Sequence, residues 1–120
     1  MGKALSALES QRRALETAGR VAMAIKRVCD ARGITLVGVY LVGSRARGDY
    51  GVWSDIDVVV VAEDIDDVNI VDRMRMFAGA LEPGVDLRVY SRGEWCSSSP
   101  WMEDMRRTAK PLLGPSNACG

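Results

Sequence analysis

Hydrophobic residues recur at helical spacing over the first quarter of the chain. Between residues 4 and 31 the apolar positions are three, four or seven residues apart, which places them on one face of a helix. These positions are Leu8, Leu15, Ala18, Ala22, Ile25 and Cys29. Gly33 supplies a stop signal. We therefore expect an N-terminal helix over residues 1–33, which packs on the rest of the chain or joins two copies in a homo-oligomer.

Three short apolar segments then predict strands. Residues 34–42 are almost wholly apolar and rich in β-branched side chains, which is typical of a strand covered on both faces. Residues 56–62 and 85–90 predict the second and third strands. Between these two strands, four apolar residues at helical spacing predict a helix that ends at Pro83 and Gly84. They are Ile70, Met74, Phe77 and Leu81.

The end of the chain carries a weaker pattern. Trp101 and Met105 predict a short amphipathic helix, and residues 114–120 are expected to form a flexible tail. The order of the elements predicts an α/β (α+β) fold, a small mixed sheet flanked by helices. A length of 120 residues suits a single domain, in which a core over residues 34–113 follows the helix over residues 1–33.

Charge and hydropathy argue against two classes of partner. The 16 basic and 16 acidic residues give a formal net charge of zero, which disfavours a broad footprint on a long nucleic acid. The longest apolar run, over residues 56–62, is far shorter than the roughly 20 residues that a membrane span needs. The first residues do not form a secretory signal, so we expect a cytoplasmic protein without membrane contact.

The chain contains three cysteines and no histidine. Cys29, Cys96 and Cys119 are odd in number and widely separated, so we expect reduced thiols and neither a disulfide framework nor a zinc site. Without imidazole, any chemistry must use carboxylates, hydroxyls and arginines.

Two aspartates stand at the start of the second predicted strand. Asp55 and Asp57 are two residues apart, so their side chains project from the same face of the sheet. Their mutual repulsion would raise the pKa of one of them unless a cation lies between them. Oxygen ligands without histidine favour Mg²⁺, with Mn²⁺ as a substitute. Taken alone, the pair is also compatible with a solvated strand end.

A glycine-rich turn follows the first predicted strand. Gly43 lets the backbone approach a ligand closely, and Ser44 adds a hydroxyl donor. Successive exposed N–H groups in such a turn bind anions, and Arg45 and Arg47 stand beside it. The turn therefore suits a triphosphate, although by itself it also fits an ordinary strand-to-helix connection.

Asp86 is the third acidic candidate. The alternation in the third strand places Asp86, Arg88 and Tyr90 on one face and the apolar residues on the other. Asp86 is therefore either a strand residue that faces water, or a carboxylate that holds a second metal ion and deprotonates an attacking hydroxyl.

Together these motifs resemble the minimal nucleotidyltransferases of the DNA polymerase β superfamily. The signature of that family is Gly-Ser, ten residues, and then Asp-x-Asp. Here Gly43 and Ser44 are followed by residues 45–54 and then by Asp55 and Asp57, and Val85-Asp86-Leu87 resembles the family's later carboxylate strand. The resemblance runs from about residue 18 to residue 113 and implies the polymerase-β-like fold, a small sheet flanked by helices.

The resemblance also implies a role for each motif. The turn would hold the nucleoside triphosphate while the aspartates bind two metal ions, and an acceptor hydroxyl would attack the α-phosphorus as pyrophosphate leaves. The nucleotide-binding candidates are Gly43, Ser44, Arg45, Arg47 and Ser54. The catalytic and metal-binding candidates are Asp55, Asp57 and Asp86.

The partner and the acceptor are likewise implied by the resemblance. Larger members of the superfamily carry a further domain for the acceptor, so we expect this short chain to find its acceptor on a partner. Short members are antitoxins that use ATP and Mg²⁺ to add AMP to a tyrosine of a HEPN toxin, which implies a protein adenylyltransferase. Two alternatives are an antitoxin that acts by binding only, and a small-molecule nucleotidyltransferase of the aminoglycoside-modifying kind.

Overall fold

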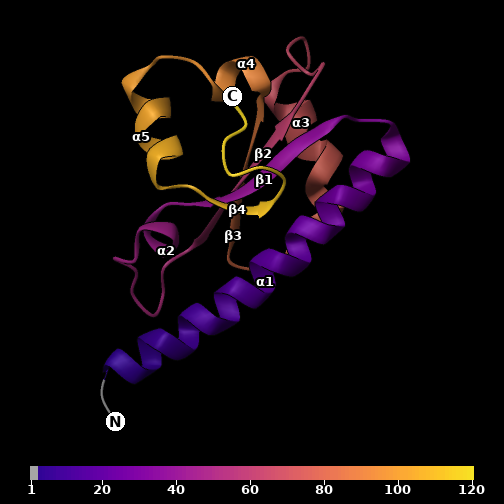
Figure 1. The fold of residues 1–120 in the computed structure, drawn as a ribbon. Helices are drawn as coiled ribbons and strands as arrows, with labels where there is room; N and C mark the ends of the chain where they lie inside the picture. The colour runs from indigo at the N-terminus through magenta and orange to yellow at the C-terminus, as the bar shows by residue number, and fades with distance from the viewer. Residues whose placement is uncertain (1–2) are drawn as a thin grey trace.

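One mixed sheet organises the chain (Figure 1). The computed structural model describes residues 3–120, with side chains from Ser6 onward. The strands are β1 (Leu36–Val42), β2 (Ile56–Ala62), β3 (Val85–Ser91) and β4 (Lys110–Leu113), in the order β3-β2-β1-β4. β1 pairs antiparallel with both β2 and β4, whereas β2 and β3 run parallel. With its flanking helices, this sheet confirms the predicted α/β class.

Helices cover both faces of the sheet. They are α1 (Lys3–Arg32), α2 (Ser44–Arg47), α3 (Ile70–Phe77) with the 3-10 turn η1 (Ala78–Ala80), α4 (Arg92–Trp95) and α5 (Pro100–Thr108). α1 and α3 pack with Val39 and Val58 on one face. α4, α5 and the C-terminal segment pack with Tyr40 and Val59 on the other. Because strand residues alternate between faces, the continuous apolar runs of β1 and β2 serve both cores.

α1 is longer than the sheet that it covers (Figure 1). It agrees with the helix predicted over residues 1–33, of which the first two lie outside the described part. Ala18, Ala22 and Ile25 are buried, whereas Leu8 and Leu15 are 61% and 45% exposed, so only part of the predicted apolar face packs on the rest of the chain. A 30-residue helix is about 45 Å long, whereas a seven-residue strand spans about 23 Å. The apolar stripe therefore continues beyond the core.

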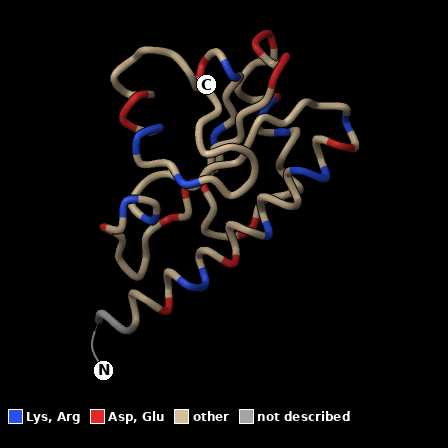
Figure 2. The backbone as a smooth tube through the Cα atoms, in the orientation of Figure 1, with Lys and Arg blue, Asp and Glu red and all other residues tan. Residues whose placement is uncertain are grey.

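Acidic and basic residues alternate along α1 (Figure 2). Glu16 and Asp30 accept from Arg12 and Lys26 at 2.6 and 2.9 Å, both at helical i,i+4 spacing. Such exposed pairs each contribute only about 0.3–0.5 kcal/mol.

Within the described residues, no helix is at once long enough and apolar enough to cross a membrane.

The segment after β3 holds more structure than its sequence pattern indicates. α5 confirms the short helix predicted around Trp101, and it begins at Pro100 with the hydroxyl of Ser99 as its N-cap. β4, which the sequence analysis does not predict, pairs with the edge of β1. Four residues are too few to show alternation, and Pro111 fits there because an edge strand tolerates a residue without an N–H group.

A disulfide joins Cys96, just after α4, to Cys119 near the end of the chain. The expectation of reduced thiols is therefore wrong for these two cysteines, and only Cys29 is free and buried. The two positions are 23 residues apart in sequence, and the return of the chain along β4 is what brings them together.

Two hydrogen bonds also attach residues 114–120, the expected flexible tail. The Tyr40 hydroxyl donates to the Pro115 carbonyl at 2.7 Å, and the Arg92 guanidinium donates to the Ala118 carbonyl at 2.6 Å. Ala118 is buried against the same face of the sheet as Tyr40. The C-terminal segment is thus held to the fold at these points, while its residues other than Ala118 are exposed.

Replacing Cys119 by Ser should lower the free energy of unfolding by about 3 kcal/mol, because the disulfide restricts the unfolded chain over a separation of 23 residues. Chemical denaturation of both proteins without reductant measures this difference. A dithiol reductant should lower the stability of the wild type to that of Cys119→Ser and leave the variant unchanged. Equal stability of the two oxidised proteins would contradict the bond.

Candidate active site

The turn after β1 depends on the backbone freedom of Gly43. Its φ of 74° and ψ of −159° lie in a region that essentially only glycine adopts. The Gly43 carbonyl accepts hydrogen bonds from the N–H groups of Ala46 and Arg47 at 3.1 and 3.0 Å, and these bonds start α2. The structure therefore confirms the predicted turn, which contains the single helical turn of α2.

Gly43 also passes directly beside the carboxylate of Asp57. Val42, the last residue of β1, pairs with Asp57 in β2, so the turn begins next to this side chain. A Cβ atom at position 43 would lie 2.2 Å from Asp57 Oδ2 and 3.1 Å from its Cγ. Residue 43 must therefore lack a side chain for steric as well as conformational reasons.

The three candidate carboxylates occupy neighbouring positions at one end of the sheet. Asp57 and Asp86 are register partners in the parallel pair of β2 and β3, so their side chains leave the same face. Asp55 lies two residues before Asp57, just ahead of β2. Asp55 and Asp86 are exposed, and Asp57 is half-buried. Among the side chains that the structure describes, no three acidic or thiol groups converge into a closed set of metal ligands.

A hollow of about 350 Å³ lies beside Asp57. Three of the predicted nucleotide-binding residues line it, namely Gly43, Ser44 and Arg47. Arg88 of β3 and Trp101 of α5 also line it, although sequence reasoning named neither as a site residue. Arg88 carries a usable signal, since it follows Asp86 by two residues and so shares its face. No motif marks Trp101.

Arg45 and Ser54, the other two predicted nucleotide-binding residues, lie outside this hollow and make contacts within the fold. Arg45 is only 5% exposed. Its guanidinium donates to the Ser54 carbonyl at 2.7 Å, to the Gln11 side chain at 3.0 Å and to the Ser10 hydroxyl at 3.0 Å. The Ser54 hydroxyl accepts from the Gly51 N–H at 2.8 Å. Both residues therefore fasten the turn to itself and to α1.

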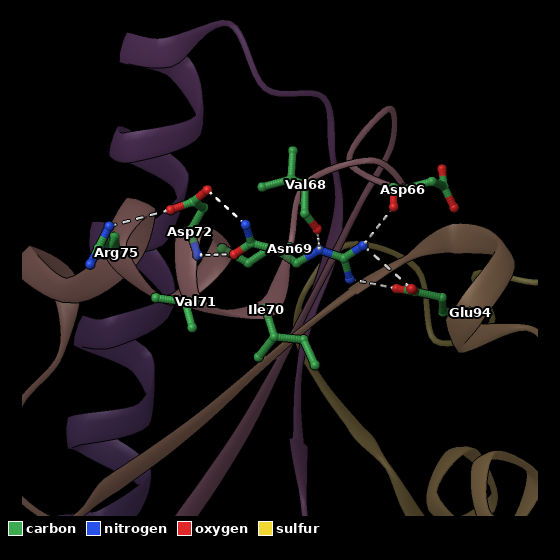
Figure 3. Close-up of a pocket in the computed structure, with 9 residues that line it drawn as sticks. Asp66, Val68, Asn69, Ile70, Val71, Asp72, Arg75 and Glu94 are labelled. Carbon is green, nitrogen blue, oxygen red and sulfur yellow. Dashed lines mark hydrogen bonds and ion pairs between the residues drawn. The ribbon is translucent and has the colours of Figure 1, made fainter.

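A larger hollow of about 720 Å³ lies over the start of α3 (Figure 3). The Arg73 guanidinium there donates to the Glu94 carboxylate at 2.6 Å and to the carbonyls of Val68 and Ile65, both at 2.8 Å. These polar groups satisfy one another, and the candidate carboxylates do not line this hollow. Of the three candidate carboxylates, Asp57 lines the smaller hollow, which is therefore the candidate active site.

Comparison with known proteins identifies the reaction class. Residues 21–103 match the nucleotidyltransferase domain family. The chain belongs to this family. A crystal structure of a candidate nucleotidyltransferase from Sulfolobus solfataricus is 35% identical over 92% of this chain and 87% of that one, with a TM-score of 0.70. A search of curated proteins returned no significant match.

A second solved structure is less similar to the present chain in both sequence and fold. It is the crystal structure of a toxin-antitoxin with AMP-PNP, 26% identical over 78% of this chain and 73% of that one. Its TM-score is 0.48.

At Asp57 of this nucleotidyltransferase, burial and neighbouring negative charges outweigh the neighbouring positive charges. Burial, followed by the negative charge of Asp86, raises the pKa of Asp57 above its usual value. Asp55 adds to this effect, whereas Arg88 and Arg47 oppose it. Carboxylate oxygens are the donors that hard divalent cations prefer, and such a cation would offset the excess negative charge. Asp55, Asp57 and Asp86 therefore fit a divalent metal by their chemistry.

Replacing Gly43 by Ala should weaken nucleotide binding at least about 10-fold and destabilise the protein by about 1–3 kcal/mol, because the new Cβ meets both strain and the Asp57 carboxylate. Titration calorimetry with ATP and chemical denaturation measure the two effects. Gly51→Ala is the matched control, since its Cβ would lie 3.9 Å from Ser54 Oγ, an ordinary contact. Wild-type ATP binding by Gly43→Ala would contradict this role of the turn.

Replacing Asp57 by Asn should raise the melting temperature at about pH 7 without divalent cations. Because its pKa is raised, folded Asp57 keeps its proton to a higher pH than the unfolded chain does. The free energy of unfolding therefore falls as pH rises from the unfolded to the folded pKa, and Asn removes this loss. The advantage of Asp57→Asn should disappear well below about pH 4, where Asp57 is protonated in both the folded and the unfolded wild type. Melting curves across this range check the prediction, and a less stable variant at neutral pH would contradict it.

Proposed function

We propose that this nucleotidyltransferase transfers AMP from ATP to a hydroxyl group of a protein acceptor. The observation that carries the proposal is the position of Asp57, which lies beside Gly43 in the turn and opposite Asp86 on the next strand. Carboxylates that suit a divalent metal thus border a turn that suits a triphosphate.

The triphosphate end of the nucleotide would bind where the turn meets the strands. The hydroxyl of Ser44 and the guanidinium groups of Arg47 and Arg88 line the hollow there. Among the residues whose side chains the structure describes, Arg47 is paired with Asp49 alone, at 3.3 Å and on the exposed surface. Such a pair contributes little to stability, so phosphate oxygens can replace the carboxylate as partners of Arg47.

The carboxylates would complete the site. Asp55, Asp57 and Asp86 would hold two Mg²⁺ ions, for which Mn²⁺ can substitute, and such ions stabilise charge on the attacking and leaving oxygens. The acceptor oxygen forms a bond to the α-phosphorus of ATP as the bond to pyrophosphate breaks. Asp86 is exposed at the rim of the site, where it can take the proton of an approaching hydroxyl and pass it to water.

The acceptor would come from another macromolecule. Asp55 and Asp86 are exposed, so a side chain of a second protein can reach the reacting end of the site. The resemblance to minimal nucleotidyltransferases supports a tyrosine of a HEPN toxin as that side chain. In this proposal the chain is an antitoxin that acts in the cytoplasm as a protein adenylyltransferase.

Incubation with ATP, Mg²⁺ and the HEPN protein of a neighbouring reading frame should add the mass of AMP to that protein, at a tyrosine. Intact mass spectrometry and peptide mapping measure the transfer. Asp86→Asn should reduce the rate by about 100-fold or more, because it removes the proton acceptor. Asp66→Asn, in the other hollow, is the matched control and should retain the wild-type rate.

Four outcomes would overturn this proposal. Absence of added mass, or equal transfer by the wild type and Asp57→Asn, would exclude catalysis by this site. Toxin neutralisation that persists in the double variant Asp55→Asn and Asp57→Asn would indicate an antitoxin that only binds. Transfer to an aminoglycoside in a panel of hydroxyl substrates would indicate a small-molecule enzyme.

A further inference from the structure

An exposed aromatic side chain forms one wall of the candidate active site. Trp101, the second residue of α5, lines the hollow beside Asp57 together with Ser44 and Arg47. Its side chain is 65% exposed, whereas the neighbouring Met102 is 8% exposed. A large apolar ring that stays in water beside a polar hollow contributes little to the core, and it can gain stabilisation by contact with a ligand.

Contacts that do not involve the Trp101 ring hold α5 in place. Met102 packs into the core on this face of the sheet, and its N–H donates to the Ser99 hydroxyl at 3.2 Å. The Arg106 guanidinium donates to the Ser97 carbonyl at 2.9 Å and also to the Trp95 carbonyl. α5 is therefore positioned before any ligand binds, which lowers the entropic cost of a contact made by Trp101.

Different walls of the hollow are lined by side chains of different kinds. Arg47 and Arg88 supply cationic groups beside the turn, and Trp101 supplies an aromatic ring from α5. A ligand that fits both features carries phosphates and a flat ring on one molecule. The volume of about 350 Å³ is within the range of small-ligand sites, which is roughly 300–1,000 Å³.

We propose that Trp101 binds the nucleobase by stacking and so positions the nucleotide in this site. This inference rests on the proposed function, since it assigns the base end of the same nucleotide. The base is covalently joined to the phosphates that the turn would hold, so it is already confined to this hollow. An indole ring stacks on any base, and the contact should therefore distinguish nucleotides from bare polyphosphate more strongly than ATP from GTP.

Binding of Mg²⁺-ATP and of Mg²⁺-tripolyphosphate, which has no base, tests the proposal directly. Trp101→Ala should raise the dissociation constant of ATP about 10-fold to 100-fold and leave that of tripolyphosphate unchanged. Trp101→Phe should keep ATP affinity within about threefold of the wild type, because a phenyl ring also stacks. Trp53→Ala is the matched control, since Trp53 is 93% exposed but does not line the hollow. Melting temperatures of all variants verify folding.

Tryptophan fluorescence supplies a second readout. ATP should quench the emission of the wild type and of Trp53→Phe, and it should leave the emission of Trp101→Phe nearly unchanged. Unchanged ATP affinity in Trp101→Ala would overturn the proposal. This holds even if the variant transfers less AMP to the acceptor, because Trp101 would then contact the acceptor and not the base. Equal weakening of ATP and tripolyphosphate would overturn it too, because Trp101 would then only shape the hollow.

Failure of this proposal can be distinguished from failure of the proposed function. If ATP binding depends on Trp101 and no acceptor receives AMP, the proposed transfer is wrong and the stacking contact stands. If AMP is transferred but ATP binding does not depend on Trp101, the proposed transfer stands and the stacking contact is wrong. A wild type that binds neither ATP nor tripolyphosphate would overturn both.

Discussion

The approach of the Gly43 backbone to the Asp57 carboxylate is the contact on which the rest of the site depends. β1 ends at Val42, whose partner in β2 is Asp57, so the chain must leave the sheet directly over this side chain. A Cβ atom 2.2 Å from Oδ2 leaves room for glycine alone. Because the Gly43 carbonyl also starts α2, this residue joins the turn to the strands that carry the candidate carboxylates.

The carboxylates of Asp57 and Asp86 lie together at one end of one face of the sheet. Along that face, Tyr40, Val59 and Val61 are buried beneath α4, α5 and the C-terminal segment, and Asp57 continues the same row. The apolar part of the row contributes to the core, whereas Asp57 and Asp86 repel each other and raise the pKa of Asp57. The repulsion between these carboxylates therefore lowers the stability of the folded protein, and the apolar packing along the rest of the sheet offsets this loss.

The sequence predicts those features that arise from local patterns. β2 begins and ends where the apolar run of residues 56–62 does, and the alternation around Asp86 places it correctly, because side-chain direction in a strand has a period of two. Long-range contacts are not encoded in such patterns. Arg45 and Arg47 look equivalent in sequence, yet two residues in a helical turn point in nearly opposite directions, and only the fold brings Gln11 to Arg45. β4 and the Cys96–Cys119 bond depend in the same way on the return of the chain.

The two parts of the site have different structural origins. The adjacent parallel strands β2 and β3 supply its charged groups, since Asp57 stands on β2 and Arg88 on β3. The segment after β3 supplies the opposite wall, because Met102 and Arg106 hold α5 through contacts with the C-terminal half of the chain and the sheet. None of the hydrogen bonds that position α5 involves a motif carboxylate. Substitutions in α5 can therefore change what the hollow accepts while the candidate catalytic carboxylates stay in place.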